Sequence, residues 1–234
     1  LRTVFRVANM SEGARLAMTC AVLLPQGGMD ADTFQAALDK EAADALFSLS
    51  RNGWLNWHDG LISIHPVIRL VCKNELTPTD ANCGPFLFQL WEQLDSMRYD
   101  KTLYRQYAEL FAAASGSLED GKGEWSLRAG RFLSELGDHS KALEFLLKAL
   151  AIREKSLPEG HPNIAVSCSN IAFILAQMSR FPEALPYIHR AVAIAESSLP
   201  EGHPRLENFR QGKEILELFA MFQEAGIDFD NPFK

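Results

Sequence analysis

Apolar residues recur at helical spacing in the second half of the chain, and the same spacing returns 42 residues later. Overlaying 121–162 on 163–204 aligns Leu133 with Leu175 and Leu146 with Ile188. This pattern predicts two helix pairs and one further helix. The helices are expected at about 124–136, 139–156, 163–178, 181–198 and 205–224.

The hexapeptide Leu-Pro-Glu-Gly-His-Pro marks the same period, because it occurs at Leu157–Pro162 and again at Leu199–Pro204. Its last proline suits the first turn of a following helix, where a missing N–H costs little. Small residues recur in register as well, and in an antiparallel helix pair they allow two backbones to approach closely. The aligned pairs are Gly130 with Ala172, Ala142 with Ala184, and Ala149 with Ala191. A fixed period of this size indicates a stacked repeat array, an architecture that mostly binds other proteins.

These two copies resemble the tetratricopeptide repeat (TPR), in the 42-residue form found in kinesin light chains. The resemblance implies an α-α superhelix over 121–234, with the last helix as a degenerate C-terminal cap. It also implies a protein or peptide partner in a groove lined by the first helix of each pair. Upstream, helical spacing at 84–97 and 101–115 predicts a linking helical pair within 77–120.

Residues 1–76 have a different pattern. Apolar spacing and turn residues predict helices at 11–24, 31–38 and 41–52, then a β-hairpin, then a helix from Pro66. The hairpin strands are expected at Leu55–Trp57 and Leu61–Ile64 around a His-Asp-Gly turn. Three helices, a hairpin and a helix form a winged-helix order. The expected fold class is therefore mainly α, a small winged-helix module with one β-hairpin followed by TPR helix pairs.

The segments "LLPQGGMDADTF" and "LSRNGWLNWHDGLISIHPVIRLVCKNEL" resemble the winged-helix domain of NB-ARC (STAND-class) signalling ATPases. That family closes the hairpin with a Met-His-Asp motif, which aligns here with Ile64, His65 and Pro66. The resemblance implies that His65 contacts the β-phosphate of ADP, and that ADP or ATP binds only with an upstream NTPase domain. Because the chain begins at Leu1 rather than Met, we expect it to come from a longer protein.

Within the repeats, first-helix positions that do not pack inside the pair are expected to face the groove. The candidate partner-binding residues are Arg128, Arg131, Ser169, Asn170, Phe173 and Gln177. The resemblance aligns Asn170 with a family asparagine that bonds to a ligand backbone. Two arginines on one groove wall would suit an acidic peptide or a carboxylate. The alternative is that they pair with Glu124 and Glu135 as solvated helix charges.

Composition argues against several other functions. The net charge of −7 disfavours nucleic acid, and the helix expected at 41–52 carries Glu41 and Asp44 against Arg51. No apolar run approaches the roughly 18 residues that a membrane span needs. The four cysteines are scattered, so we expect reduced thiols in a cytoplasmic protein.

Sites for catalysis, metal or cofactor are not expected within this chain. Gly116–Gly123 nearly matches a P-loop, but a helical segment precedes it where a strand is required. His161 and His203 recur with the repeat and are expected to pack in its loops. We therefore expect no enzyme activity. The leading hypothesis is the sensor part of a STAND-type ATPase. A stand-alone TPR adaptor and a TPR-containing transcription regulator stay open as alternatives.

Overall fold

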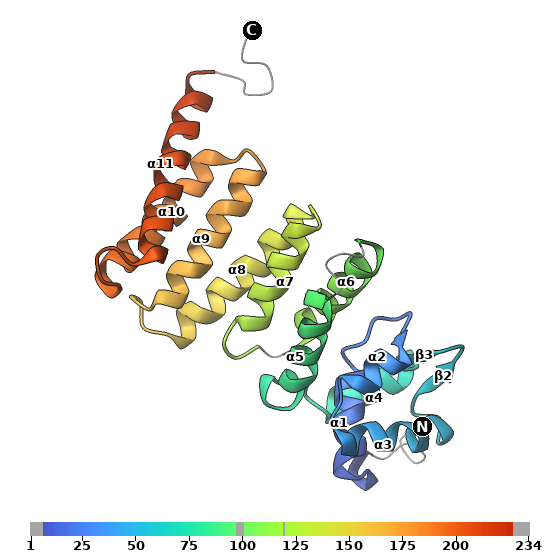
Figure 1. Cartoon of the computed structure of the whole chain (residues 1–234). Helices are drawn as coiled ribbons and strands as arrows, with labels where there is room; N and C mark the ends of the chain where they lie inside the picture. The colour runs from blue at the N-terminus through green and yellow to red at the C-terminus, as the bar shows by residue number, and fades with distance from the viewer. Residues whose placement is uncertain (1–6, 97–100, 119, 227–234) are drawn as a thin grey trace. The chain divides into compact units, whose positions relative to one another are not determined.

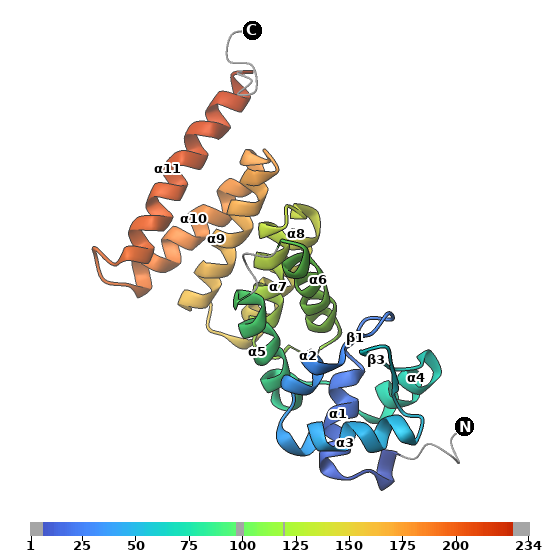
Figure 2. The same cartoon turned by 45° about the vertical axis from the view of Figure 1, so that its right-hand side comes forward.

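The computed structural model describes residues 7–96, 101–118 and 120–226. These residues form a mainly helical fold with one small sheet (Figures 1 and 2). The chain divides into two compact units, Leu1–Gly121 and Lys122–Lys234. The helical pair expected between the two modules lies in the first of these units.

The first unit begins with a short 3-10 helix and then alternates helices with three short strands. Its elements up to residue 75 are η1 Val7–Asn9, α1 Glu12–Ala21, β1 Met29–Asp30, α2 Ala31–Ala36, α3 Lys40–Arg51, β2 Asn56–His58, β3 Leu61–Ser63 and α4 Pro66–Glu75. Local signals fix several ends. The Ser11 side chain accepts a hydrogen bond from the Ala14 N–H at the start of α1. Gly53, at φ 76°, ends α3 in the left-handed region that favours glycine.

The three strands form one antiparallel sheet in the order β1-β3-β2. The predicted hairpin is confirmed, with Trp57 opposite Ile62 across β2 and β3. Asp59 and Gly60 both have positive φ, as a tight two-residue hairpin turn requires. Strand β1 was not predicted. It is two residues long and pairs Met29 with the other edge of β3, also at Ile62.

In the core of the first unit, α1 packs against α3 and against the helix at Asp80–Ser96, and α2 packs against the sheet. Phe34, Met18 and Ile62 are completely buried. Gly13 permits the approach of α1 to α3, because a Cβ there would lie 2.6 Å from the Glu41 carbonyl oxygen. Arg69 of α4 donates hydrogen bonds to carbonyls just after α1, at Val22 (2.9 Å), Leu24 and Pro25 (3.2 Å). Burial lowers the pKa of this guanidinium.

Helices α5 (Asp80–Ser96) and α6 (Lys101–Ser117) complete the first unit. Phe86 of α5 meets Phe34 of α2 edge to face, with ring centroids 5.4 Å apart. The Tyr107 hydroxyl of α6 hydrogen bonds to the Thr33 hydroxyl at 2.9 Å. Helix α5 starts earlier than expected, because Thr79 and Asn82 cap each other's backbone N–H groups.

The second unit is an array of antiparallel helices that lie side by side in chain order (Figures 1 and 2). The helices are α7 Glu124–Glu135, α8 His139–Ser156, α9 Pro162–Gln177, α10 Phe181–Ser198 and α11 Pro204–Glu224. All five match the sequence prediction to within one residue at each end. The order of contacts is that of helix pairs, with α7 against α8, α9 against α10, and α11 against α10.

The small residues that recur with the repeat lie where helices approach most closely. Ala142, Ala149, Ala184 and Ala191 are completely buried. Helices α7 and α8 also approach closely at Gly130. A Cβ added there would lie 2.8 Å from Leu146 Cγ and 3.1 Å from the Ala142 carbonyl oxygen. The expectation that these positions exclude larger side chains is confirmed.

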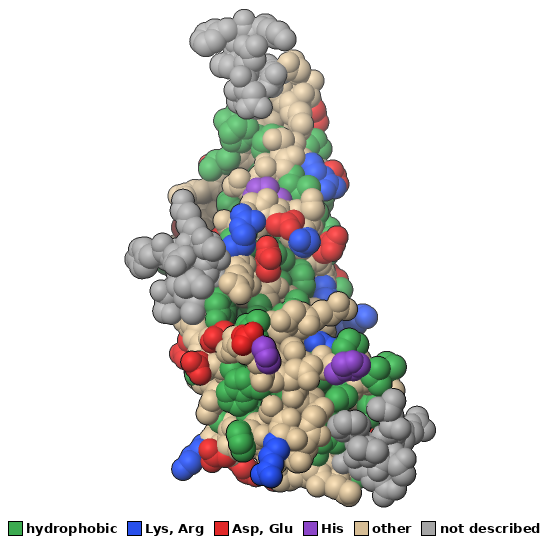
Figure 3. All heavy atoms as spheres, turned by 90° about the vertical axis from the view of Figure 1, so that its right-hand side faces the viewer, with side chains coloured by type: hydrophobic (Ala, Val, Ile, Leu, Met, Phe, Trp, Pro, Cys, Tyr) green, Lys and Arg blue, Asp and Glu red, His purple; other side chains and the backbone are tan. Residues whose placement is uncertain are grey.

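Within the described residues, no helix combines the length and the apolar character needed to cross a membrane. Acidic and basic side chains are interspersed on the molecular face that Figure 3 presents.

Candidate partner-binding face

Two neighbouring hollows open on the side of the second unit that α7, α9 and α11 share. The first, called here the polar hollow, has a volume of about 260 Å³ and lies between α7 and α9. Its lining mixes charged, amide and apolar groups. The lining residues are Arg131, Ser134, Glu135, Leu146, Asn170, Phe173 and Ile174.

The second, called here the apolar hollow, has a volume of about 610 Å³ and lies between α9 and α11 over α10. Aromatic and aliphatic side chains dominate its lining, and every polar lining group is uncharged. The residues that matter below are Phe173, Phe181, Ile188, Gly212, Ile215 and Phe219. Ser169 and Gln177 of α9 lie at its wall.

Five of the six candidate residues line these hollows. Arg131 and Asn170 line the polar hollow, and Ser169 and Gln177 line the apolar one. Phe173 lines both, and its side chain is 56% exposed although it is a large hydrophobic residue. Aligning the two repeats by sequence therefore selected residues of α7 and α9 that line the same hollow in the structure.

Arg128 is the exception. Its guanidinium Nε donates to Glu124 Oε1 at 3.0 Å, and the group lies over the Trp125 ring at 5.6 Å from the centroid. The side chain is only 23% exposed and lines neither hollow. The structure therefore gives Arg128 an ion pair with Glu124 of the same helix, which is the pairing that the sequence left open as an alternative to ligand binding. Because Arg128 pairs with Glu124, one turn away in α7, and lies outside both hollows, its role in partner binding stays a prediction.

Arg131 behaves differently. Its side chain is exposed, and it makes no hydrogen bond or ion pair with any residue that the structure describes. It therefore leaves one guanidinium at the polar hollow, beside the Asn170 amide. A guanidinium and an amide together can hold a carboxylate and a peptide group.

Comparison with known proteins addresses this unit alone. Residues 123–197 match the family model of the tetratricopeptide repeat. No curated protein matches the chain. The matched segment contains α7, α8 and α9 and nearly all of α10, so both hollows have walls within TPR helices. The match includes no residue of the first unit.

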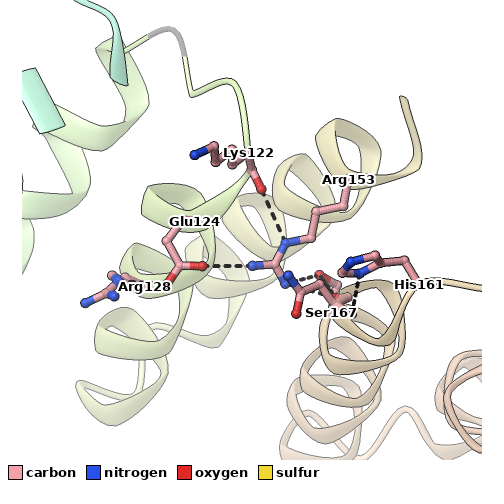
Figure 4. Close-up of polar contacts among 7 residues, drawn as sticks. Lys122, Glu124, Arg128, Arg153, His161 and Ser167 are labelled. Carbon is pink, nitrogen blue, oxygen red and sulfur yellow. Dashed lines mark hydrogen bonds and ion pairs between the residues drawn. The ribbon is translucent and has the colours of Figure 1, made fainter. Parts of the chain in front are cut away.

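The TPR helices are held together by a buried arginine that the sequence analysis did not identify. Arg153 of α8 is 3% exposed. Its guanidinium donates to Glu124 Oε2 (3.0 Å), Ser167 Oγ (3.0 Å) and the carbonyl oxygens of Asn163 (3.0 Å) and Lys122 (3.4 Å). Figure 4 shows this group between the start of α7 and the start of α9. It joins the two TPR copies by hydrogen bonds.

The recurring histidines, which lie in the repeat loops as expected, also make a local hydrogen bond. His161 Nδ1 accepts a hydrogen bond from the Asn163 N–H at 3.1 Å, and His203 Nδ1 accepts one from the Arg205 N–H at 3.1 Å. Each imidazole thus caps the N-terminus of the helix that its following proline begins. Among the described residues, no group of three or more potential metal ligands comes together.

His65 makes the same contact in the first unit. Its Nδ1 accepts a hydrogen bond from the Val67 N–H at 3.2 Å, and Pro66 is the first residue of α4. The ring is exposed rather than packed under the hairpin. Because Nδ1 accepts this hydrogen bond, Nε2 is the ring nitrogen that can carry a proton and donate from the exposed edge of the ring.

The four cysteines are free and buried. Burial raises the pKa of Cys72 and of Cys168 to about 11. Cys20 and Cys83 lie with their sulfur atoms 3.7 Å apart, and their hydrogen bond, together with burial, raises the pKa of Cys20. Cys20, Cys72 and Cys168 therefore have little thiolate character at neutral pH, which disfavours nucleophilic chemistry at these three residues.

Proposed function

We propose that the second unit binds a protein or peptide partner on the face that α7, α9 and α11 share. The observation that carries this proposal is the exposed Arg131, which lines the polar hollow with Asn170 and Phe173 and makes no ion pair with any described residue. TPR arrays commonly bind partners through such surfaces. Glu135 lines the same hollow, but no ion pair joins it to Arg131 among the described residues, so the guanidinium stays available to a carboxylate of a partner.

The test compares two arginines of one helix. Peptides selected from a phage-displayed random dodecapeptide library on the whole chain serve as probes, with affinity measured by fluorescence anisotropy. Arg131→Ala should weaken binding at least tenfold and flatten its dependence on salt, because the exposed cation is lost. Arg128→Ala is the matched control and should change affinity less than threefold, since Glu124 already holds that side chain. Equal effects of the two substitutions, or no selected peptides at all, would refute the proposal.

We infer further that the first unit is a winged-helix module of a STAND-type ATPase, and that the chain is the sensor part of such a protein. The element order supports this inference, since a helix, a strand, two helices, a hairpin and a helix follow one another around a three-stranded sheet. The TPR copies that follow in the same chain support it too. No substrate-handling group is proposed for the chain itself, which would have no enzyme activity alone.

His65 fits one part of a nucleotide site. A phosphate oxygen needs a donor, and Nδ1 capping leaves Nε2–H as an exposed donor on the ring. When bound, ADP would supply the negative charge that holds a resting state. His65 is one donor only, so binding would require the upstream NTPase domain. Accordingly, calorimetric titration of this chain with Mg-ATP should give no micromolar binding.

Two substitutions in the longer protein separate the cap from the phosphate contact. His65→Asn keeps a side-chain acceptor for the Val67 N–H but removes the Nε2 donor, whereas His65→Ala removes both. If His65 holds ADP, both variants should retain less nucleotide after purification than the wild type. Nucleotide loss in His65→Ala together with wild-type content in His65→Asn would assign the residue to capping α4 alone.

The stand-alone adaptor is the second candidate, and the binding face would serve it equally well. The transcription regulator has less support. Helix α3 carries two basic and two acidic residues, and its Phe47 is a large hydrophobic side chain that is 72% exposed. A helix that enters the major groove needs several Lys or Arg to meet phosphates and bases.

A further inference from the structure

Two of the buried cysteines form a pair that the partner-binding function does not use. Cys20 lies near the end of α1 and Cys83 near the start of α5. Their side chains are 1% and 0% exposed, and the Cys20 thiol donates a hydrogen bond to Cys83 Sγ at 3.7 Å. The two residues are 63 positions apart in the sequence, so only the fold brings their sulfur atoms together.

The packing near the pair leaves room for the sulfur atoms to come closer. A disulfide bond is about 2.05 Å long, so the two atoms would have to approach by about 1.6 Å. A cavity of about 610 Å³ is lined by α1, the end of α4 and the start of α5. Thr19 and Asn82, the sequence neighbours of the two cysteines, both line this cavity. It gives α1 and α5 room to shift, and it brings solvent close to a buried pair.

Cys72 and Cys168 lack this arrangement. Both thiols are free and buried, as those of the pair are. Among the residues that the structure describes, however, neither sulfur atom has a second sulfur within hydrogen-bonding distance. An isolated thiol cannot form a bridge without a large movement of the backbone. These two cysteines are therefore matched controls within the same chain.

We propose that Cys20 and Cys83 are a redox-active pair that a peroxide converts into a disulfide joining α1 to α5. Cys83 Sγ attacks one oxygen of hydrogen peroxide, the O–O bond breaks, and the Cys83 proton leaves with the other oxygen as water. Cys20 Sγ then attacks the sulfur of the Cys83 sulfenic acid. The S–S bond forms, the S–O bond breaks, and the Cys20 proton leaves with the hydroxyl group as water. Two thiols are oxidised as one peroxide is reduced to two water molecules.

The hydrogen bond between the two thiols sets the order of the steps. It holds the Cys20 proton between the sulfur atoms, and it is the main cause of the raised pKa of Cys20. Cys83 Sγ is the acceptor, so the contact does not hold its own proton and Cys83 reacts first. Once Cys83 is a sulfenic acid, its sulfur is electrophilic and no longer holds the Cys20 proton. Cys20 is then the nucleophile already in contact with it.

The test treats the whole folded chain with hydrogen peroxide and removes the excess with catalase. Remaining thiols are alkylated with N-ethylmaleimide in denaturant, and peptides are mapped by mass spectrometry without reduction. We expect a crosslinked peptide that joins Cys20 to Cys83, with Cys72 and Cys168 alkylated as in the untreated chain. Dithiothreitol should restore alkylation of the pair. The urea midpoint of the first unit should rise by at least about 1 M, because the new bond closes a loop that spans 63 positions.

Two serine variants test the order of the steps, and circular dichroism melts check that both are folded. Cys20→Ser removes the thiol that closes the bridge, so dimedone should trap a sulfenic acid at Cys83. Cys83→Ser removes the thiol that reacts first, so dimedone should label Cys20 only weakly. If either variant fails to fold, the peptide map of the wild type decides alone.

Full alkylation of Cys20 and Cys83 after peroxide treatment would overturn the inference, as would a sulfinic acid at Cys83 without a crosslink. Crosslinks that involve Cys72 or Cys168 as often as the pair would show oxidation of an unfolded chain and would overturn it too. Stronger dimedone labelling of Cys20 than of Cys83 would refute the proposed order of steps. None of these results depends on peptide binding at Arg131, so this inference and the proposed function can fail independently.

Discussion

One substitution made at two glycines tests the packing of the repeats most directly. Gly130 lies in α7 and Gly212 in α11, both inside helices. On helix propensity alone, replacing either by alanine should stabilise the protein by about 0.5–1 kcal/mol. Any difference between the two variants therefore measures what surrounds the new methyl group.

The surroundings are opposite. At Gly130 the methyl carbon would lie 2.8 and 2.9 Å from Leu146 Cγ and Cδ2 and 3.1 Å from the Ala142 carbonyl oxygen. Leu146 is fully buried and cannot move aside freely. Overpacking of this kind costs about 1–3 kcal/mol, so the net effect of Gly130→Ala should be a loss of up to about 2.5 kcal/mol once the gain in helix propensity is subtracted. Gly212→Ala, with one contact at 3.6 Å, should instead gain about 0.5–1 kcal/mol.

Urea-dependent hydrogen exchange read by mass spectrometry suits this comparison, because it follows the second unit separately from the first. With an m-value of about 2 kcal/mol/M, the two variants should differ by about 1 M in midpoint, with the wild type between them. A midpoint for Gly130→Ala at or above the wild-type value would show that α7 and α8 do not approach closely there. Equal destabilisation by both substitutions would show that the contrast in packing does not exist.

Four further outcomes follow from the described contacts. Ala184→Leu, at a completely buried helix contact, should lower the free energy of unfolding by about 1–3 kcal/mol or more, seen as a melting shift of several degrees. Arg153→Ala should lower it by about 2–4 kcal/mol in urea unfolding, since hydrogen bonds between the TPR copies are lost. Because burial raises the pKa of Cys72 and of Cys168 from 9.0 to about 11, their contribution to stability is present below pH 9 and lost as pH rises through 11, so urea midpoints should fall over that range. His161→Ala should lower the melting temperature through a lost cap of about 1 kcal/mol, whereas His161→Asn should retain most of it.

The helices of the second unit could be predicted from the sequence because two signals agreed. The apolar spacing predicted which faces of the helices are buried. Pro162 and Pro204 indicated where two helices begin, and α9 and α11 begin at these residues. In the first unit, residue types that favour helix ends lie at two of the observed ends, Ser11 before α1 and Gly53 after α3. Strand β1 could not be predicted, because two residues cannot show a period of two.

The part of the candidate face on α9 could be predicted from the sequence, whereas the environment of Arg128 on α7 could not. Asn170, Phe173 and Gln177 lie on one face of α9, and helical spacing together with the repeat register was enough to place them there. Arg128 was open to two interpretations, because the carboxylate of Glu124 lies four residues before it. Periodicity describes which way a side chain points, but it does not say which neighbour that side chain binds.

The Arg153 contacts and the apolar hollow could not be predicted, because both involve residues that are not repeated in the other copy. Arg153 aligns with Ala195 in the next copy, so the period offered no reason to expect a buried charge. The hollow depends on Gly212 and Phe219, which lie in the degenerate α11, where the alignment with α9 no longer holds. Both features arise from contacts between helices, and neither is visible in one helix alone.

Three histidines cap helix N-termini in the described part of this chain, and this shared local role explains why a histidine recurs with the repeat. His65, His161 and His203 each precede a proline, and each accepts a hydrogen bond from the N–H two residues later, at 3.1–3.2 Å. Because the same contact occurs once in the first unit and twice in loops of the second unit, a local need of the helix N-terminus explains all three. The recurrence of His161 and His203 thus requires no ligand. For His65 it means that Nδ1 is already occupied, so any nucleotide role must use Nε2. Comparison of His65→Asn with His65→Ala is therefore the measurement that separates the two roles.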